Sequence, residues 1–179
     1  MNKAPRKETL LVLGGARSGK SSWALRYVEE AYGSPVFLAT AQVLDEEMAE
    51  RVRLHRQARG PGWNVLEEPL AVPEALACRC EGADAVLVDC LTVWLSNVML
   101  QQGEARAEEC QADLGSALER SPRSVVLVAN EVGAGVVPEH RLGRMFRDAA
   151  GLLNQRVAAL ADRVVYLTAG LPLWLKGEP

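Results

Sequence analysis

A glycine-rich loop near the start of the chain constrains the fold more than any other feature. Residues 14–21 read Gly-Gly-Ala-Arg-Ser-Gly-Lys-Ser and satisfy the pattern G-x-x-x-x-G-K-[ST]. The apolar run Leu10–Leu13 precedes the loop, and a helical pattern of apolar residues follows it. Strand, loop and helix in this order, with the full motif spacing, favour a phosphate-binding loop over a glycine turn that merely precedes a helix.

This loop type binds phosphate through its backbone. The glycines let N–H groups curl around phosphate oxygens, and the N-terminus of the next helix adds a favourable dipole. We expect Lys20 to lie on the β- and γ-phosphates of a nucleotide and Ser21 to hold Mg²⁺.

The apolar pattern predicts an α/β fold with a mostly parallel sheet and helices on both faces. Five apolar runs are nearly continuous, as expected for strands buried on both faces. They are Leu10–Leu13, Val36–Ala39, Ala85–Val88, Val125–Ala129 and Val164–Leu167. Helices are expected at Lys20–Tyr32, at Leu44–Ala58, once or twice within Leu91–Arg120, and at about Glu139–Ala161. Strands alternating with helices imply right-handed βαβ units. We expect a disordered tail over residues 1–8 and one domain over residues 9–179.

Composition narrows the choice of partner and compartment. The net charge of −3 and the aromatic content of 5% argue against a nucleic-acid-binding surface. The four cysteines have no C-x-x-C or zinc-ligand spacing, and the sequence shows no signal peptide, so we expect free thiols and a cytoplasmic protein. No apolar run approaches the roughly 20 residues that span a bilayer.

Ligands of parallel sheets bind beyond the carboxyl ends of the strands, so the residues there are candidates for the site. Asp89 follows the run Ala85–Val88 and is expected either to hold Mg²⁺ or to cap the helix that starts near Leu91. Asn130 and Glu131 follow the fourth run but do not form the guanine-reading N-K-x-D motif, which counts against a Ras-like switch protein.

A basic helix carries one of the two histidines. Arg51, His55 and Arg59 are spaced i, i+4 and i+8 and therefore share one helix face. Nearby cations disfavour the imidazolium form, and a neutral imidazole is a nucleophile. Spacing alone leaves a solvated basic helix with an incidental histidine as the commoner interpretation. His140 shows no chemical neighbour in the sequence and is interpreted as structural.

Several segments together resemble one family over about residues 10–168. They are the loop 14–21, Ala39-Thr40-Ala41-Gln42, Leu44–Met48, Arg51–Arg56, Trp63 with Glu67, Asp89–Thr92, Asn130–Gly133, Val137-Pro138, Phe146–Asp148 and Asn154-Gln155. The chain is thereby identified as similar to the bifunctional adenosylcobinamide kinase/adenosylcobinamide-phosphate guanylyltransferases of cobalamin biosynthesis. The loop alone is common, whereas these segments in this order are specific.

The resemblance implies a RecA-like P-loop fold, a homotrimer and two reactions. ATP or GTP phosphorylates the aminopropanol hydroxyl of adenosylcobinamide, and GTP then donates GMP to that phosphate through a guanylyl-histidine at His55. The catalytic residues implied are His55 and Lys20, and the metal ligands are Ser21 and Asp89. The implied nucleotide contacts are Gly14, Gly15, Ala16, Arg17, Ser18, Gly19, Lys20, Ser21, Ala39, Thr40, Ala41, Arg56, Gln57, Ala58, Arg59, Glu67 and Asp89.

Some relatives have two adjacent histidines where this chain has Leu54-His55, so His55 is the one candidate in this helix. Other functions stay open at this stage. A P-loop small-molecule kinase would phosphorylate its substrate without forming a covalent GMP adduct. A nucleotide-dependent switch would form no small-molecule product, and a RecA-like nucleic-acid-binding module would need a local basic patch.

Overall fold

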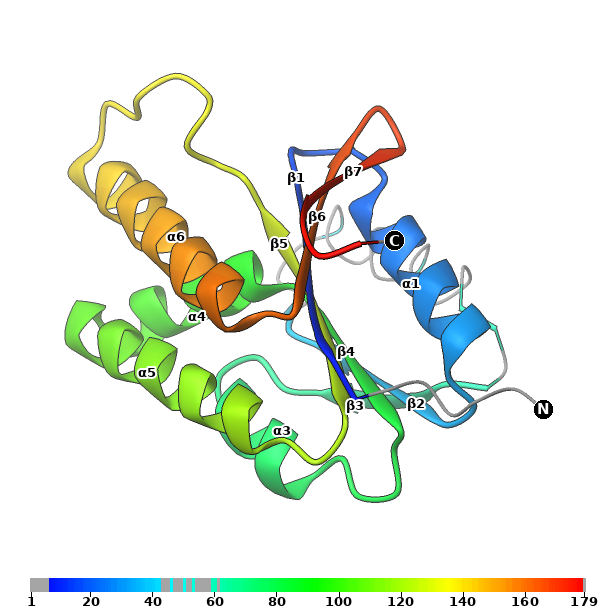
Figure 1. Ribbon diagram of the computed structural model, residues 1–179. Helices are drawn as coiled ribbons and strands as arrows, with labels where there is room; N and C mark the ends of the chain where they lie inside the picture. The colour runs from blue at the N-terminus through cyan, green and yellow to red at the C-terminus, as the bar shows by residue number, and fades with distance from the viewer. Residues whose placement is uncertain are drawn as a thin grey trace.

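A seven-stranded sheet forms the centre of the molecule (Figure 1). The structure is a computed structural model that describes residues 7–42, 46, 50, 53, 59–60 and 62–178. The strand order is β3-β2-β4-β5-β1-β6-β7, and every pair is parallel except β6 with β7. The order places β5 between β1 and β4, so the carboxyl ends of these three strands lie side by side.

Twelve elements follow one another in the described parts of the chain. The strands are β1 (Thr9–Gly14), β2 (Pro35–Ala39), β3 (Asn64–Glu67), β4 (Ala85–Asp89), β5 (Ser124–Asn130), β6 (Arg163–Thr168) and β7 (Leu171–Lys176). The helices are α1 (Lys20–Ala31), α3 (Val72–Cys78), α4 (Leu91–Gln102), α5 (Glu104–Arg120) and α6 (Arg141–Leu160).

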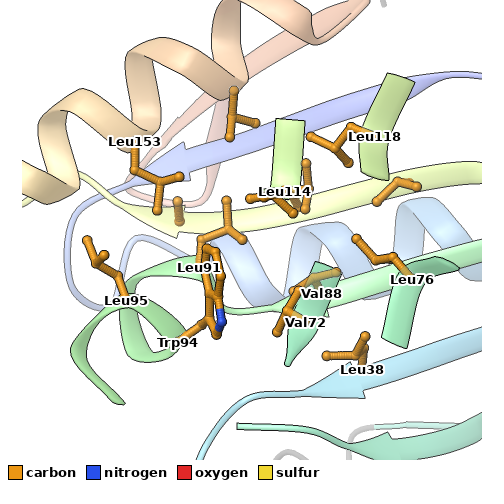
Figure 2. Packing of buried hydrophobic residues seen from close by; sticks show 14 of the residues in the cluster. Leu38, Val72, Leu76, Val88, Leu91, Trp94, Leu95, Leu114, Leu118 and Leu153 are labelled. Carbon is orange, nitrogen blue, oxygen red and sulfur yellow. The ribbon is translucent and has the colours of Figure 1, made fainter. Parts of the chain in front are cut away.

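Helices cover both faces of the sheet. Figure 1 shows α1 on one face and α3, α4, α5 and α6 on the other. The core accordingly has two parts. In the larger one, Trp94 of α4 is fully buried among leucine and valine side chains of the sheet and the helices around it (Figure 2). The smaller part lies between α1 and the opposite face, with Leu25 and Val28 against β1 and β4.

The five predicted strands and the parallel sheet are confirmed, because all five runs are strands whose interiors are buried. Three elements were not predicted: β3, α3 and β7. Three of the four residues of β3 are exposed, as are five of the six residues of β7, so neither strand has a continuous buried run. α3 has only 7 residues, too few for a clear helical period.

The expected helix Leu44–Ala58 lies largely outside the described residues. Glu46, Glu50 and Arg53 are described there and are helical. Nε of Arg53 donates to the carboxylate of Glu50 at 2.6 Å, an i,i+3 pair on an exposed helix face.

Glu8, the last residue of the tail expected over residues 1–8, is built into the fold, whereas residues 1–6 lie outside the described residues. Its carbonyl accepts from the N–H of Val125, and its carboxylate accepts from Tyr32 Oη at 2.9 Å and from Arg163 Nε at 2.8 Å. The carboxylate also accepts from the hydroxyl of Tyr27. Composition suggested a polar, disordered start, whereas these long-range bonds order its last residue.

Candidate functional site

The phosphate loop lies between β1 and α1, as the motif predicts. Gly14 is the last residue of β1 and pairs with Asn130 of β5 and Leu167 of β6. A Cβ on Gly14 would lie 2.4 Å from Ser18 Oγ and 2.7 Å from the carbonyl oxygen of Leu167, so no side chain fits there. A Cβ on Gly15 would meet no atom within 4 Å.

Backbone bonds and one lysine hold the loop. The N–H of Ser18 donates to the carbonyl of Gly15 at 3.3 Å, and Nζ of Lys20 donates to the same carbonyl at 3.0 Å. Gly19 has a φ of 89°, the left-handed region that favours glycine, and it occupies the N-cap of α1 without a side-chain cap. The first N–H groups of α1 therefore have no helical acceptor, which suits an anion-binding end.

Lys20 is partly buried close to the carboxyl end of β4. Burial lowers the pKa of Lys20 below its ordinary value, while the nearby Cys90 and Asp89 side chains act in the opposite direction. Because Lys20 is partly shielded from water, its charge interacts more strongly with a bound phosphate than an exposed lysine would. The structure thus brings together two residues, Lys20 and Asp89, that the sequence placed far apart.

Thr40 fixes the backbone next to Asp89. Its N–H donates to the carbonyl of Asp89 at 3.3 Å, and its hydroxyl is bonded to both backbone groups of Cys90. Asn97 Nδ2 donates to the carbonyl of Thr40 at 2.9 Å. Thr40 has no exposed surface, so in this structure its side chain holds the neighbouring backbone in place. Ala39 and Ala41 on either side are partly exposed.

The capping alternative for Asp89 is not what the structure shows. The N-cap of α4 is Cys90, whose Sγ accepts from the N–H of Val93 at 3.5 Å. The peptide bond between Asp89 and Cys90 is cis. Burial raises the pKa of Cys90 to about 11, so its thiol stays protonated at neutral pH, as expected for a small buried side chain.

The residues implied for Mg²⁺ have the donor atoms that this ion prefers. Ser21 follows Lys20 in the first turn of α1, and Asp89 is near enough to raise the pKa of Lys20. A hydroxyl and a carboxylate are hard oxygen donors, which Mg²⁺ prefers alongside substrate phosphates and water. These two side chains would hold the ion, which neutralises phosphate charge when bound.

Asn130 is a candidate that the sequence motifs did not single out as a site residue. It ends β5 between the phosphate-loop strand and the Asp89 strand. Its N–H donates to Thr92 Oγ1 at 2.7 Å, and its carbonyl accepts from Asn154. Its side-chain Oδ1 is buried and has no hydrogen-bond partner within the described part of the chain. Such an atom is costly unless a ligand or water satisfies it. In the sequence, Asn130-Glu131 argues only against a Ras-like switch protein, because it does not match the N-K-x-D motif.

A cavity of about 400 Å³ lies along the edge strand β3 and the segment just before it. Its lining includes Arg59, Trp63 and Glu67. The guanidinium of Arg59 lies 4.1 Å from the centroid of the Phe37 ring, and Trp63 meets the same ring edge-on. Glu67 pairs in register with Ala39, which in turn pairs with Asp89, so the Glu67 end of the cavity faces the same end of the sheet as the phosphate loop. A larger cavity of about 540 Å³ lies between α3 and α5, and none of its lining residues is a predicted site residue.

Four predicted site residues, His55, Arg56, Gln57 and Ala58, lie outside the described residues. The other implied contacts are described and come from the phosphate loop and from the carboxyl ends of β2, β3 and β4, except Arg59, which lies ahead of β3. Cys78, Cys80, Cys90 and Cys110 are free thiols, as predicted. None of the helices in the described segments has the length and hydropathy that crossing a bilayer requires.

Comparison with known proteins identifies the family of the chain. The family described as cobinamide kinase / cobinamide phosphate guanyltransferase matches residues 10–175. The chain is 44% identical over 169 residues to the bifunctional adenosylcobalamin biosynthesis protein CobP of Pseudomonas aeruginosa, covering 94% of this chain and 98% of that protein. It is 37% identical over 180 residues to the bifunctional adenosylcobalamin biosynthesis protein CobU of Escherichia coli, covering 93% of this chain and 99% of that protein.

Solved structures agree on the fold. An ATPase from the type III secretion system of pathogenic bacteria superposes with a TM-score of 0.59 at 15% identity, over 90% of this chain and 51% of that one. The fold is therefore that of the RecA-like P-loop ATPases. With the family match over nearly the whole length, this chain belongs to the cobinamide kinase / cobinamide phosphate guanyltransferase family.

Proposed function

We propose that this protein phosphorylates the aminopropanol hydroxyl of adenosylcobinamide and then converts the phosphate to adenosylcobinamide-GDP with GTP. The observation that carries the proposal is the phosphate loop with Lys20 beside Asp89, in a chain of this family. In the first step the hydroxyl oxygen bonds to the γ-phosphorus of ATP or GTP, the bond to the nucleoside diphosphate breaks, and the hydroxyl proton leaves to solvent. Lys20 and the loop N–H groups position the phosphates and neutralise their charge.

The second step uses His55 as a nucleophile. A neutral imidazole nitrogen bonds to the α-phosphorus of GTP, pyrophosphate leaves, and the ring proton is lost. An oxygen of adenosylcobinamide phosphate then bonds to the same phosphorus, the P–N bond breaks, and the ring takes up a proton from solvent, which restores the neutral imidazole. Splitting one displacement into two easier ones is the usual benefit of covalent catalysis.

The cavity beside Glu67 supports a site for the nucleotide base. A carboxylate accepts two hydrogen bonds from a ring that carries adjacent N–H donors, as guanine does, and Arg59 and Trp63 offer flat surfaces next to it. The proposal also includes Mg²⁺ bound by Ser21 and Asp89 and a homotrimeric assembly, both of which the family resemblance implies. It includes a cytoplasmic location, which the composition of the sequence favours.

One experiment separates the two activities. Mass spectrometry of the intact wild-type chain after incubation with GTP should show one added GMP. This adduct should be lost in acid and stable in base. His55→Ala should lose the adduct while it still phosphorylates adenosylcobinamide, and Lys20→Ala should lose most of the phosphorylation. His140→Ala is the matched control, because the second histidine is exposed at the start of α6 and should be dispensable.

The outcomes distinguish the alternatives. A phosphorylated product without any GMP adduct would identify a kinase without transferase activity. An adduct that survives in His55→Ala would refute the assignment of the nucleophile. Nucleotide hydrolysis without either product would point to a switch protein.

A further inference from the structure

The turn that joins β6 to β7 contacts the phosphate loop directly (Figure 1). The N–H of Gly170 donates to the carbonyl of Ser18 at 3.0 Å. Its Cα lies 3.3 Å from the position that a Cβ on Gly19 would occupy. A hairpin near the end of the chain therefore closes over a loop near its beginning, and two glycines face each other where they meet.

The turn has a demanding backbone conformation. Thr168 pairs with Leu171, so only Ala169 and Gly170 form the loop of the hairpin. Their φ values are 51° and 79°, both in the left-handed region. Two such residues in succession define the type I′ turn, which matches the twist of a β-hairpin. Alanine is unfavourable in the first position, whereas glycine in the second position adopts this φ without a steric penalty.

We propose that this hairpin turn is a positioning element for the phosphate loop, and that Gly170 is the residue through which it acts. In a trans peptide the C=O and N–H groups point in opposite directions. When Gly170 holds the carbonyl of Ser18 on the hairpin side, the N–H of Gly19 points away from the hairpin, toward the interior of the loop. That N–H is then a preset donor for a phosphate oxygen, and no peptide rotation is needed on binding.

The loop has few other restraints on this peptide. α1 has no side-chain cap at Gly19. The other bonds of the loop join Ser18 and Lys20 to the carbonyl of Gly15, Trp23 to the carbonyl of Gly19 and Glu131 to the carbonyl of Gly14. None of these bonds is made to the C=O or N–H of the Ser18–Gly19 peptide, because the N–H of Ser18 and the carbonyl of Gly19 belong to the neighbouring peptides. The bond from Gly170 is made to that C=O.

The proposal rests on nucleotide binding at this loop, as in the proposed function, and a set of three variants tests it. Gly170→Val should disrupt the turn, because a β-branched residue does not adopt a left-handed φ. Gly170→Asn should preserve it, because asparagine tolerates this region best among residues with a side chain. Gly82→Val is the matched control: Gly82 has a φ of 78°, a Cβ there meets no atom within 4 Å, and it precedes β4 at the opposite end of the sheet.

Two measurements are made on each variant. The affinities for GTP and for inorganic tripolyphosphate, each with Mg²⁺, are measured by calorimetric titration. Gly170→Val should bind both ligands at least about tenfold more weakly than wild type, the loss expected for one charge-assisted hydrogen bond. Gly170→Asn and Gly82→Val should bind within about twofold of wild type. Without any ligand, hydrogen exchange over residues 14–21 should become faster in Gly170→Val alone.

Each result bears on the proposal separately from the enzyme's activity. Equal affinity and equal exchange in Gly170→Val and wild type would overturn it. Equal losses in Gly82→Val would also overturn it, because backbone strain alone would then explain the effect. A wild type that binds neither ligand would refute nucleotide binding, whereas the exchange comparison would still decide whether the hairpin orders the loop.

Discussion

The hydroxyl of Thr40 bridges both backbone groups of Cys90. It donates to the carbonyl of Cys90 at 2.8 Å and accepts from the N–H of Cys90 at 2.8 Å. The bridge joins the ends of two neighbouring strands and fixes the chain immediately after Asp89. Replacement of the Thr40 side chain should therefore move the carboxylate of Asp89.

Thr40→Val keeps the shape of the side chain but removes both hydrogen bonds. The two backbone groups of Cys90 are then buried without this partner, so the free energy of unfolding should fall by about 1–3 kcal/mol. The initial rate of phosphoryl transfer should fall as well, because Asp89 is no longer held in place. Urea denaturation and initial-rate measurements check this, and Thr40→Ser should retain both properties. Full activity of Thr40→Val would show that the bridge does not position Asp89.

The two neighbouring glycines of the phosphate loop should differ sharply. Gly14→Ala places a Cβ 2.7 Å from the carbonyl of Leu167, a backbone atom that cannot move aside easily. It should distort the loop and weaken GTP binding severely. Gly15→Ala meets no atom within 4 Å and should bind GTP within a few-fold of wild type. Titration calorimetry on the pair tests the geometry, and equal effects of the two substitutions would contradict it.

Nucleotide binding should be linked to the protonation of Lys20. Its pKa lies below the ordinary value in the free protein because it is partly buried, and phosphate binding should raise the pKa. Between these two pKa values the protein takes up a proton as it binds, so affinity should fall as the pH rises through the pKa of the free protein. Calorimetry in alkaline buffers of different ionisation enthalpy measures this uptake. Lys20→Met should bind more weakly and show no such uptake.

Asn130→Ala should lower activity without a comparable loss of stability, because the side-chain oxygen of Asn130 is buried without a partner in the described segments. Asn130→Ala removes an Oδ1 that has no partner within the described segments, so the free energy of unfolding should change by less than about 1 kcal/mol. If this oxygen serves a bound ligand or its water, the rate of phosphoryl transfer should fall at least tenfold. A variant with unchanged rate and lower stability would assign Asn130 a purely structural role.

Glu8 should contribute to stability and not to catalysis. Its carboxylate accepts from Tyr32 and Arg163 far from the phosphate loop, and both members of the Glu8–Arg163 ion pair are mostly shielded from water. Glu8→Gln should lower the free energy of unfolding by about 1–3 kcal/mol, because charge-assisted bonds are replaced by weaker ones. GTP affinity should stay within about twofold of wild type. Glu104→Gln, at the exposed start of α5, is the control for a charge change without these bonds.

Local sequence patterns were sufficient to predict the parallel sheet and the phosphate loop. Continuous apolar runs indicate strands buried on both faces, and the loop motif is local, so both are readable from neighbouring residues. The sequence also placed Asp89 at the end of a strand, although it left open whether Asp89 caps a helix. β3 and β7 escaped prediction because edge strands are half exposed and lack such runs.

The contacts that support the phosphate loop could not be predicted from local sequence patterns. The bridge from Thr40 to Cys90 joins residues fifty positions apart, and the bond from Gly170 to Ser18 joins nearly the two ends of the chain. Neither threonine nor glycine carries a signal for such a partner, because each bond depends on which strands become neighbours. The strand order placed these residues together, and that order is a property of the folded sheet and not of any local segment.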